Sequence, residues 1–161
     1  MVLLCGALRQ GILDRLLNRY GMVLEWVAAD SEIAGSYWGE SEAGLIGNKL
    51  LVREDTPLHS AFHEACHYIC MDQPRRDGLH TDAGGDYDEE NGVNYLQILL
   101  SEYVPECGCE RMFADMDAWG YSFRLGSAKA WFEQDADDTR QWLLQYGLID
   151  AQQQLTWQLR S

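Results

Sequence analysis

The amino-acid sequence predicts an α+β fold, because segments with the periodicity of helices and segments typical of strands follow one another without a long linker. The chain has 161 residues, 47% of them apolar, which is enough for one buried core. We therefore expect a single domain over residues 1–161. Within it, helical segments at 58–71 and 89–103 pack against each other beside a small mixed or antiparallel sheet.

The N-terminal part predicts one helix and a few short strands. Residues 7–19 repeat leucine and isoleucine at helical spacing, and Gly21 follows as a stop. Residues 22–29 and 45–53 are short apolar runs, as expected of buried strands. A loop rich in glycine, serine and glutamate separates these two runs, with a short strand at 36–39.

The middle of the chain predicts two helices joined by a loop. Thr56 and Pro57 mark the start of the helix at 58–71, because a hydroxyl can cap a helix and proline fits its first position. Residues 77–88 are rich in glycine and aspartate and indicate a loop. The segment 89–103 follows as an amphipathic helix.

The last third predicts a helical extension at 106–161. Residues 111–120 favour a short helix, and Ser127 is placed to cap another at 128–134. A final helix is expected at 135–146.

The charge balance argues against two classes of partner. The sequence has 12 Lys and Arg residues against 26 Asp and Glu, a net charge of −14 at pH 7. A nucleic-acid clamp or a protein that binds an anionic membrane needs a basic face. No apolar run approaches the roughly 20 residues of a membrane span, and the five cysteines form no disulfide framework. We expect a reduced, cytoplasmic protein with no nucleic-acid or membrane partner.

Residues 63–67, His-Glu-Ala-Cys-His, form an HExxH motif inside the helix predicted at 58–71. Four residues are a little over one helical turn, so His63 and His67 project from one face and can bind the same metal ion. Glu64 lies beside that ion, where it can take a proton from a metal-bound water. A shuffled sequence of this composition would contain the pattern roughly 0.7% of the time. The motif therefore predicts a metal site.

A catalytic zinc of this kind needs a third protein ligand and keeps one position for water. Glu89 is the first choice, because it lies in line with an apolar stripe at Val93, Leu96 and Leu100, where a carboxylate is costly unless it is paired or metal-bound. Glu90 comes second, because its helical face looks solvated, with Asn94, Gln97 and Ser101. The helix dipole alone would also favour both acidic residues at this N-terminus.

Other ligands stay open. Asp82 and Asp86 in the glycine-rich loop could supply the carboxylate, and His59 or His80 could add an imidazole. A third histidine six residues after the motif is ruled out, because Gln73 occupies that position. The hydrolytic chemistry would also need a donor for an oxyanion; Arg124 and Tyr121 are candidates between which the sequence does not choose.

Two segments together carry a family resemblance. PLHSAFHEACHYIC at 57–70, followed by EENGVNYLQILL at 89–100, resembles the ImmA/IrrE family of short HExxH metallopeptidases, a gluzincin-like group. The resemblance covers about residues 8–105. It implies a strand before the motif helix, a catalytic zinc with Glu89 on the position of the third ligand, and hydrolysis of peptide bonds.

These observations favour a zinc metallopeptidase that holds one Zn²⁺ per chain through His63, His67 and Glu89, with Glu64 as general base and a peptide or protein as substrate. The alternative is a non-catalytic zinc-binding or protein-interaction module, in which the metal is closed to water. Glu64 favours the enzyme, because a purely structural site needs no general base at that position.

Overall fold

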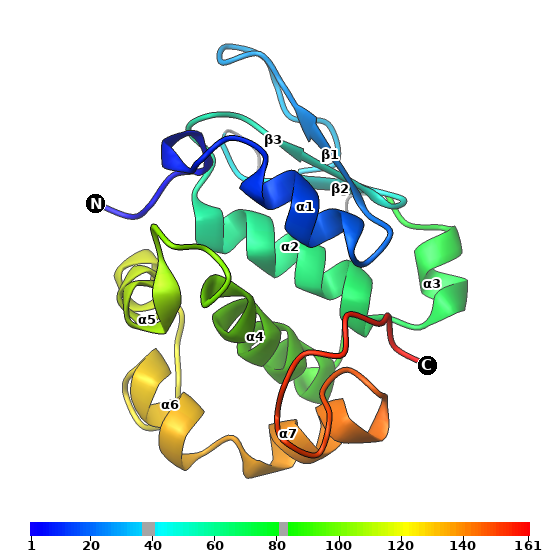
Figure 1. Cartoon of the computed structure of the whole chain (residues 1–161), viewed down its shortest axis with the longest axis vertical. Helices are drawn as coiled ribbons and strands as arrows, with labels where there is room; N and C mark the ends of the chain where they lie inside the picture. The colour runs from blue at the N-terminus through cyan, green and yellow to red at the C-terminus, as the bar shows by residue number, and fades with distance from the viewer. Residues whose placement is uncertain (37–40, 81–83) are drawn as a thin grey trace.

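The computed structural model of the chain describes residues 1–36, 41–80 and 84–161. These residues form one α+β domain in which a sheet, helix α2, helix α4 and helix α7 follow one another as layers (Figure 1). The sheet has three strands: β1 (Val23–Trp26), β2 (Gly44–Ile46) and β3 (Lys49–Val52). Their order is β1-β3-β2, with β1 parallel and β2 antiparallel to β3. The predicted fold class and the mixed sheet are thus confirmed.

The apolar run at 45–53 is a hairpin rather than one strand. Gly47 has a φ of 57° between β2 and β3, a left-handed conformation that suits glycine and lets the chain reverse there. The short strand predicted at 36–39 lies mostly outside the described residues; Ser36 alone is described, and it pairs with Gly44 in an isolated bridge. Strand β1 is an edge strand with three of its four side chains exposed.

The N-terminal helix is shorter than predicted. A 3-10 turn, η1, covers Cys5–Ala7, and α1 covers only Ile12–Asn18. Gly11, with a φ of 83°, separates the two and lies at the N-terminal end of α1. The buried leucines of α1 nevertheless lie on one face, as the spacing predicted, and the helix packs against β1.

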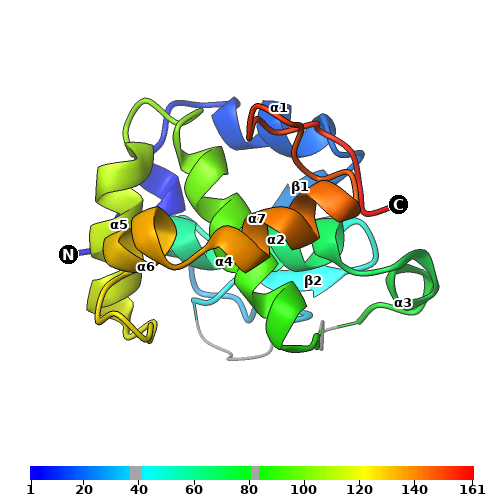
Figure 2. The same ribbon diagram turned by 90° about the horizontal axis from the view of Figure 1, so that it is seen from below.

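Helices α2 (Leu58–Cys70) and α4 (Tyr87–Ser101) form the centre of the molecule. Helix α2 has β2 and β3 on one side and α4 on the other, so most of its side chains are buried. Figure 2 shows α4 running between α2 and α7. The predicted packing of the two helices is confirmed. The predicted cap is not: the Thr56 hydroxyl accepts a hydrogen bond from the Arg53 amide instead of capping α2.

The remaining helices are α3 (Gln73–Asp77), α5 (Gly108–Trp119), α6 (Ala128–Gln134) and α7 (Asp137–Gln145). Ser127 caps α6 as predicted, by accepting a bond from the Ala130 amide. Helices α5 and α7 both pack against α4, and the last residues return to the end of α2. None of the helices in the described part of the chain has the length and apolar content needed to cross a membrane.

Candidate metal centre

Three side chains from α2 and α4 converge on one point. His63 and His67 come from α2 and Glu90 from α4, and their ligand atoms all lie within 4.8 Å of one another. His63 Nε2 is 2.9 Å from Glu90 Oε1, and His67 Nε2 is 3.4 Å from Glu90 Oε2. Zinc bonds of about 2.0–2.1 Å with tetrahedral angles place neighbouring donors about 3.3 Å apart. The three side chains therefore form a group that could hold a metal ion.

A buried amide orients one of the histidines. The Nδ1 atom of His63 lies 2.8 Å from Gln97 Oε1, and Gln97 is fully buried on α4. Because that oxygen only accepts hydrogen bonds, it selects the tautomer in which Nδ1 carries the proton. Nε2 is then the ring nitrogen that faces Glu90: it donates to the carboxylate while it carries a proton and can bind a metal ion once it has lost it. This is the arrangement by which proteins orient a metal-binding histidine.

The structure brings Glu90, rather than Glu89, to the histidines. The Glu89 carboxylate is 2% exposed and is bound by Arg75 at 2.7 and 2.8 Å and by Arg160 at 3.3 Å. The reason is that α4 is covered on several sides, by α2, α5 and α7. More than one side of α4 is therefore buried. The side expected to be solvated is one of them: Gln97 and Ser101 are fully buried, and Glu90 and Gln97 contact His63 of α2.

The other candidate ligands are placed elsewhere or not described. Asp86 caps α4 by accepting a bond from the Glu89 amide, and His80 pairs with Ile46 in a β-bridge. His59 lies one turn before His63 but bonds Tyr121. None of these three belongs to the metal-binding group found among the described residues. Asp82 lies outside the described residues.

The two cysteines of α2 are also outside the group. Cys66 and Cys70 are fully buried, and burial raises the pKa of both thiols above the usual range. Both therefore stay protonated at neutral pH, as buried structural cysteines do.

In the group of His63, His67 and Glu90, the histidines favour the charged form of the glutamate, and the glutamate favours the charged form of His63. Burial raises the pKa of Glu90, but the hydrogen bonds and the charges of His63 and His67 together outweigh it, so the pKa falls well below its usual range. Burial lowers the pKa of His63, but the hydrogen bond and charge of Glu90, the bond to Gln97 and the charge of Glu64 together outweigh it, so the pKa is raised. Glu90 is therefore a carboxylate anion at neutral pH, the form in which it can bind a metal ion.

Glu64 lines a cavity of about 420 Å³ next to His63. Its side chain is largely buried, and burial raises its pKa more than the neighbouring His67 and His63 lower it. A carboxylate with a raised pKa accepts a proton more readily, as a general base must, and a pKa closer to the working pH suits a group that both takes up and returns a proton. The structure places Glu64 next to His63 in the lining of this cavity, and its predicted role as general base stays a prediction.

Tyr121 lines the same cavity. Its hydroxyl is 3.2 Å from His59 Nδ1, and its ring meets that of His63 edge-on with centroids 5.7 Å apart. Burial raises the pKa of Tyr121 above its usual range, so the hydroxyl keeps its proton. Arg124, the other candidate donor, pairs with Asp135 and does not line the cavity.

Sequence reasoning missed Gln97 altogether as part of the site. A signal was present, because Glu90 and Gln97 lie seven residues apart on one helical face. Histidines on α2 need polar partners across the interface, so a polar stripe on the facing helix marks the contact.

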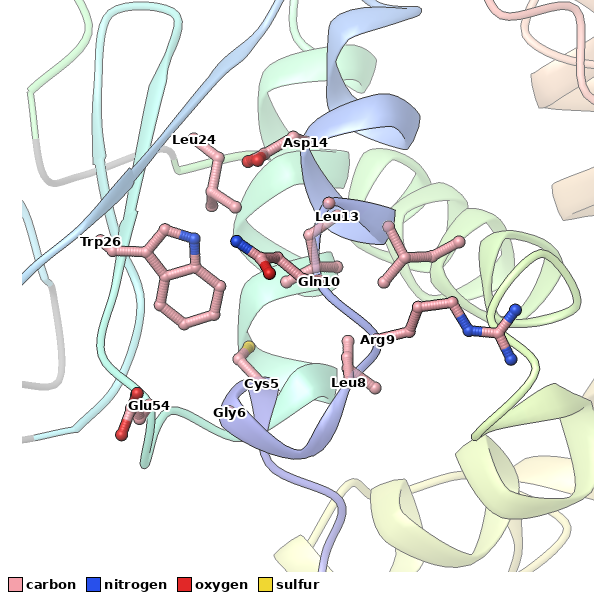
Figure 3. A pocket seen from close by; sticks show the side chains of 12 residues that line it. Cys5, Gly6, Leu8, Arg9, Gln10, Leu13, Asp14, Leu24, Trp26 and Glu54 are labelled. Atoms are coloured by element: carbon pink, nitrogen blue, oxygen red, sulfur yellow. The ribbon is translucent and has the colours of Figure 1, made fainter.

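A second cavity, of about 390 Å³, lies between η1, α1 and β1. Figure 3 shows the side chains of Trp26, Leu24 and Gln10 close together around it, with the thiol of Cys5 below them. Burial raises the pKa of Cys5 to about 12, so it is no nucleophile at neutral pH. This cavity contains none of the three grouped metal-binding side chains.

Comparison with known proteins adds no relative: no family model, no curated protein and no solved structure matches the chain. The resemblance to the ImmA/IrrE family therefore stands on the residues quoted above. What the structure supports of it is the His63, His67 and Glu90 group at the interface of α2 and α4.

Proposed function

We propose that the chain is a zinc-dependent metallopeptidase, with His63, His67 and Glu90 as metal ligands and Glu64 as general base. The observation that carries the proposal is the combination of two imidazoles and a carboxylate at ligand spacing with a buried carboxylate in an open cavity beside them. Two histidines and one glutamate are a donor set that catalytic zinc uses.

Zinc held by such a set lowers the pKa of a bound water to about 7 and polarises a substrate carbonyl. Glu64 takes a proton from the attacking water and returns it to the leaving amine, a role that its raised pKa suits. Tyr121, with its hydroxyl protonated and facing the same cavity, donates a hydrogen bond to the carbonyl oxygen as it gains negative charge.

An open site fits better than a closed, non-catalytic one. A structural zinc site is almost always surrounded by four protein ligands. Among the residues that the structure describes, the group of histidine, cysteine and carboxylate ligands has three members. A metal ion held by these three side chains would keep a position for water, and the cavity that Glu64 lines is next to it.

The first test is metal analysis of untagged protein purified without chelator, followed by hydrolysis of fluorescein-labelled casein. We expect about one zinc per chain. Glu64→Gln should keep the zinc and lower turnover by about 10²–10⁴, the range that general acid–base groups contribute. Glu25→Gln, an exposed glutamate on β1, is the matched control and should hydrolyse casein at the rate of the unaltered chain.

Two outcomes would contradict the proposal. If the chain takes up no zinc even on titration, the metal site is wrong. If Glu64→Gln keeps full turnover, the general base is not Glu64.

A further inference from the structure

Several side chains that line the cavity beside Glu64 have no part in the mechanism above, and Glu42 and Trp119 are two of them. Glu42 lies just before β2, and Trp119 is the last residue of α5. Both line the cavity together with His63, Glu64 and Tyr121. They come from distant parts of the chain, and both line the cavity that a peptide bound at the metal centre would enter.

The Glu42 carboxylate has no cationic partner among the described residues. It forms no hydrogen bond or ion pair there, although many carboxylates of this chain do. Its charge nevertheless reaches the site, since it raises the pKa of Tyr121. A carboxylate that is partly buried and unpaired is available for a cation brought by a ligand.

The side chain of Trp119 is half-exposed and contacts a buried ring. Its ring contacts that of His59 with centroids 4.9 Å apart, and His59 is 2% exposed and also bonded to Tyr121. The indole itself is 49% exposed. A large, half-exposed aromatic side chain in contact with a buried ring thus lines the cavity.

No lysine or arginine lines the cavity in the described part of the chain. A substrate side chain that enters therefore meets an aromatic surface, an unpaired carboxylate and the general charge of −14. Cations are attracted both to the face of a tryptophan and to a carboxylate, and arginine adds a planar group that stacks on the indole.

We propose that Glu42 and Trp119 form a subsite for an arginine or lysine side chain next to the scissile bond, so that the enzyme selects basic peptides. This inference rests on the proposed peptidase function, whose metal centre defines where the scissile bond lies. The cation sits between the carboxylate of Glu42 and the indole of Trp119.

The test uses two quenched fluorescent peptides that differ in one position, arginine against citrulline. Citrulline has nearly the same shape but no charge. We expect kcat/KM to be about tenfold higher for the arginine peptide, the size of a partly desolvated cation–aromatic contact. Glu42→Gln and Trp119→Leu should each remove most of this preference by lowering the arginine value, whereas Glu25→Gln leaves the preference intact. Added salt should lower it as well.

A binding measurement separates this inference from the proposed function. Zinc-treated Glu64→Gln protein is titrated with the same two sequences carrying a fluorescein label, and anisotropy gives their dissociation constants. Tighter binding of the arginine peptide supports the subsite even if the unaltered chain hydrolyses nothing. Hydrolysis of both peptides with equal kcat/KM and equal affinity overturns the subsite and leaves the peptidase intact. An arginine preference that survives Glu42→Gln overturns the assignment to Glu42.

Discussion

Two adjacent glutamates on α4 have opposite surroundings. Glu89 belongs to an arginine cluster with Arg75 and Arg160, and its carboxylate is 2% exposed. Glu90 belongs to a histidine cluster with His63 and His67, and its side chain is 45% exposed. Guanidinium groups stay charged, so they occupy a carboxylate permanently. Imidazoles can be neutral and can share a carboxylate with a metal ion. The comparison teaches that the more buried acid is the structural one.

The arginine cluster joins three parts of the chain. Arg75 comes from α3, Glu89 from α4, and Arg160 from the segment that returns to the end of α2. Gly85 faces the carboxylate so closely that a Cβ there would overlap it. The cluster therefore holds the first turn of α4 in place, and so it also positions Glu90, the next residue.

The largest effect is expected from Glu89→Gln. It leaves two arginines facing a neutral amide at a buried position, so the free energy of unfolding should fall by about 3 kcal/mol, the lower end for a broken buried pair because Arg75 is partly exposed. Urea unfolding of metal-free protein measures this change. The folded variant should still bind one zinc; loss of zinc with unchanged stability would reverse the roles of the two glutamates.

Glu90→Gln should have the complementary effect. The zinc affinity should drop by more than about 100-fold, beyond what loss of an orienting partner costs. The unfolding free energy of the metal-free protein should change by less than about 1 kcal/mol, because the pairs that Glu90 makes are partly exposed. Competition with a chromophoric chelator gives the affinity. A variant that binds zinc as tightly as the unaltered chain would remove Glu90 from the site.

Gln97→Leu tests the orienting amide. It removes the acceptor for His63 Nδ1 while it keeps the size of the side chain, so zinc affinity should fall by about 10–100-fold. Gln97→Glu keeps an acceptor at the same place and should retain more of the affinity than Gln97→Leu. Equal affinities of the two variants would show that the contact does not orient the ligand. The chelator assay measures both.

The smallest effect is expected from the titration of His59, which is buried next to Tyr121. Burial lowers the pKa of His59 from 6.5 to about 4, more than the charge of Asp115 raises it. Between these values the unfolded chain binds a proton that the folded chain does not, so stability falls as the pH falls. We expect a loss of about 1 kcal/mol from pH 6.5 to about 5.5.

His59→Asn is the matched variant for this measurement, because its amide keeps a partner for the Tyr121 hydroxyl. Urea unfolding of metal-free protein at the two pH values compares it with the unaltered chain. The same loss in both proteins would assign the pH dependence to other groups.

Much of the fold could be predicted from the sequence, because α2 and α4 carry strong helical periodicity and their packing follows from the apolar faces. Which of the two glutamates, Glu89 or Glu90, lies next to the histidines could not be predicted from the sequence. It depends on which side of α4 meets α2, and a helix covered on several sides has no single buried face. Gly92, for example, packs against Trp142 of α7, far along the chain.

The cavity depends even more on tertiary structure. Glu42, Trp119 and Tyr121 come from segments on either side of the motif helix, and no local pattern connects them. The HExxH spacing, in contrast, acts within one helix, and this is why His63 and His67 could be grouped as metal ligands from the sequence and Glu64 placed beside them.

The contact between Arg160 and Glu89 also orders events during folding. It joins residues 71 positions apart, and the backbone of Arg160 bonds that of Ile69 at the end of α2. Contacts of such long range form only after a large loop has closed. A growing chain can pair α2 with α4 before that, but Glu89 then has Arg75 as its partner and Arg160 is still missing. The first turn of α4 therefore gains its second guanidinium partner only after a residue 71 positions further along the chain has been synthesised.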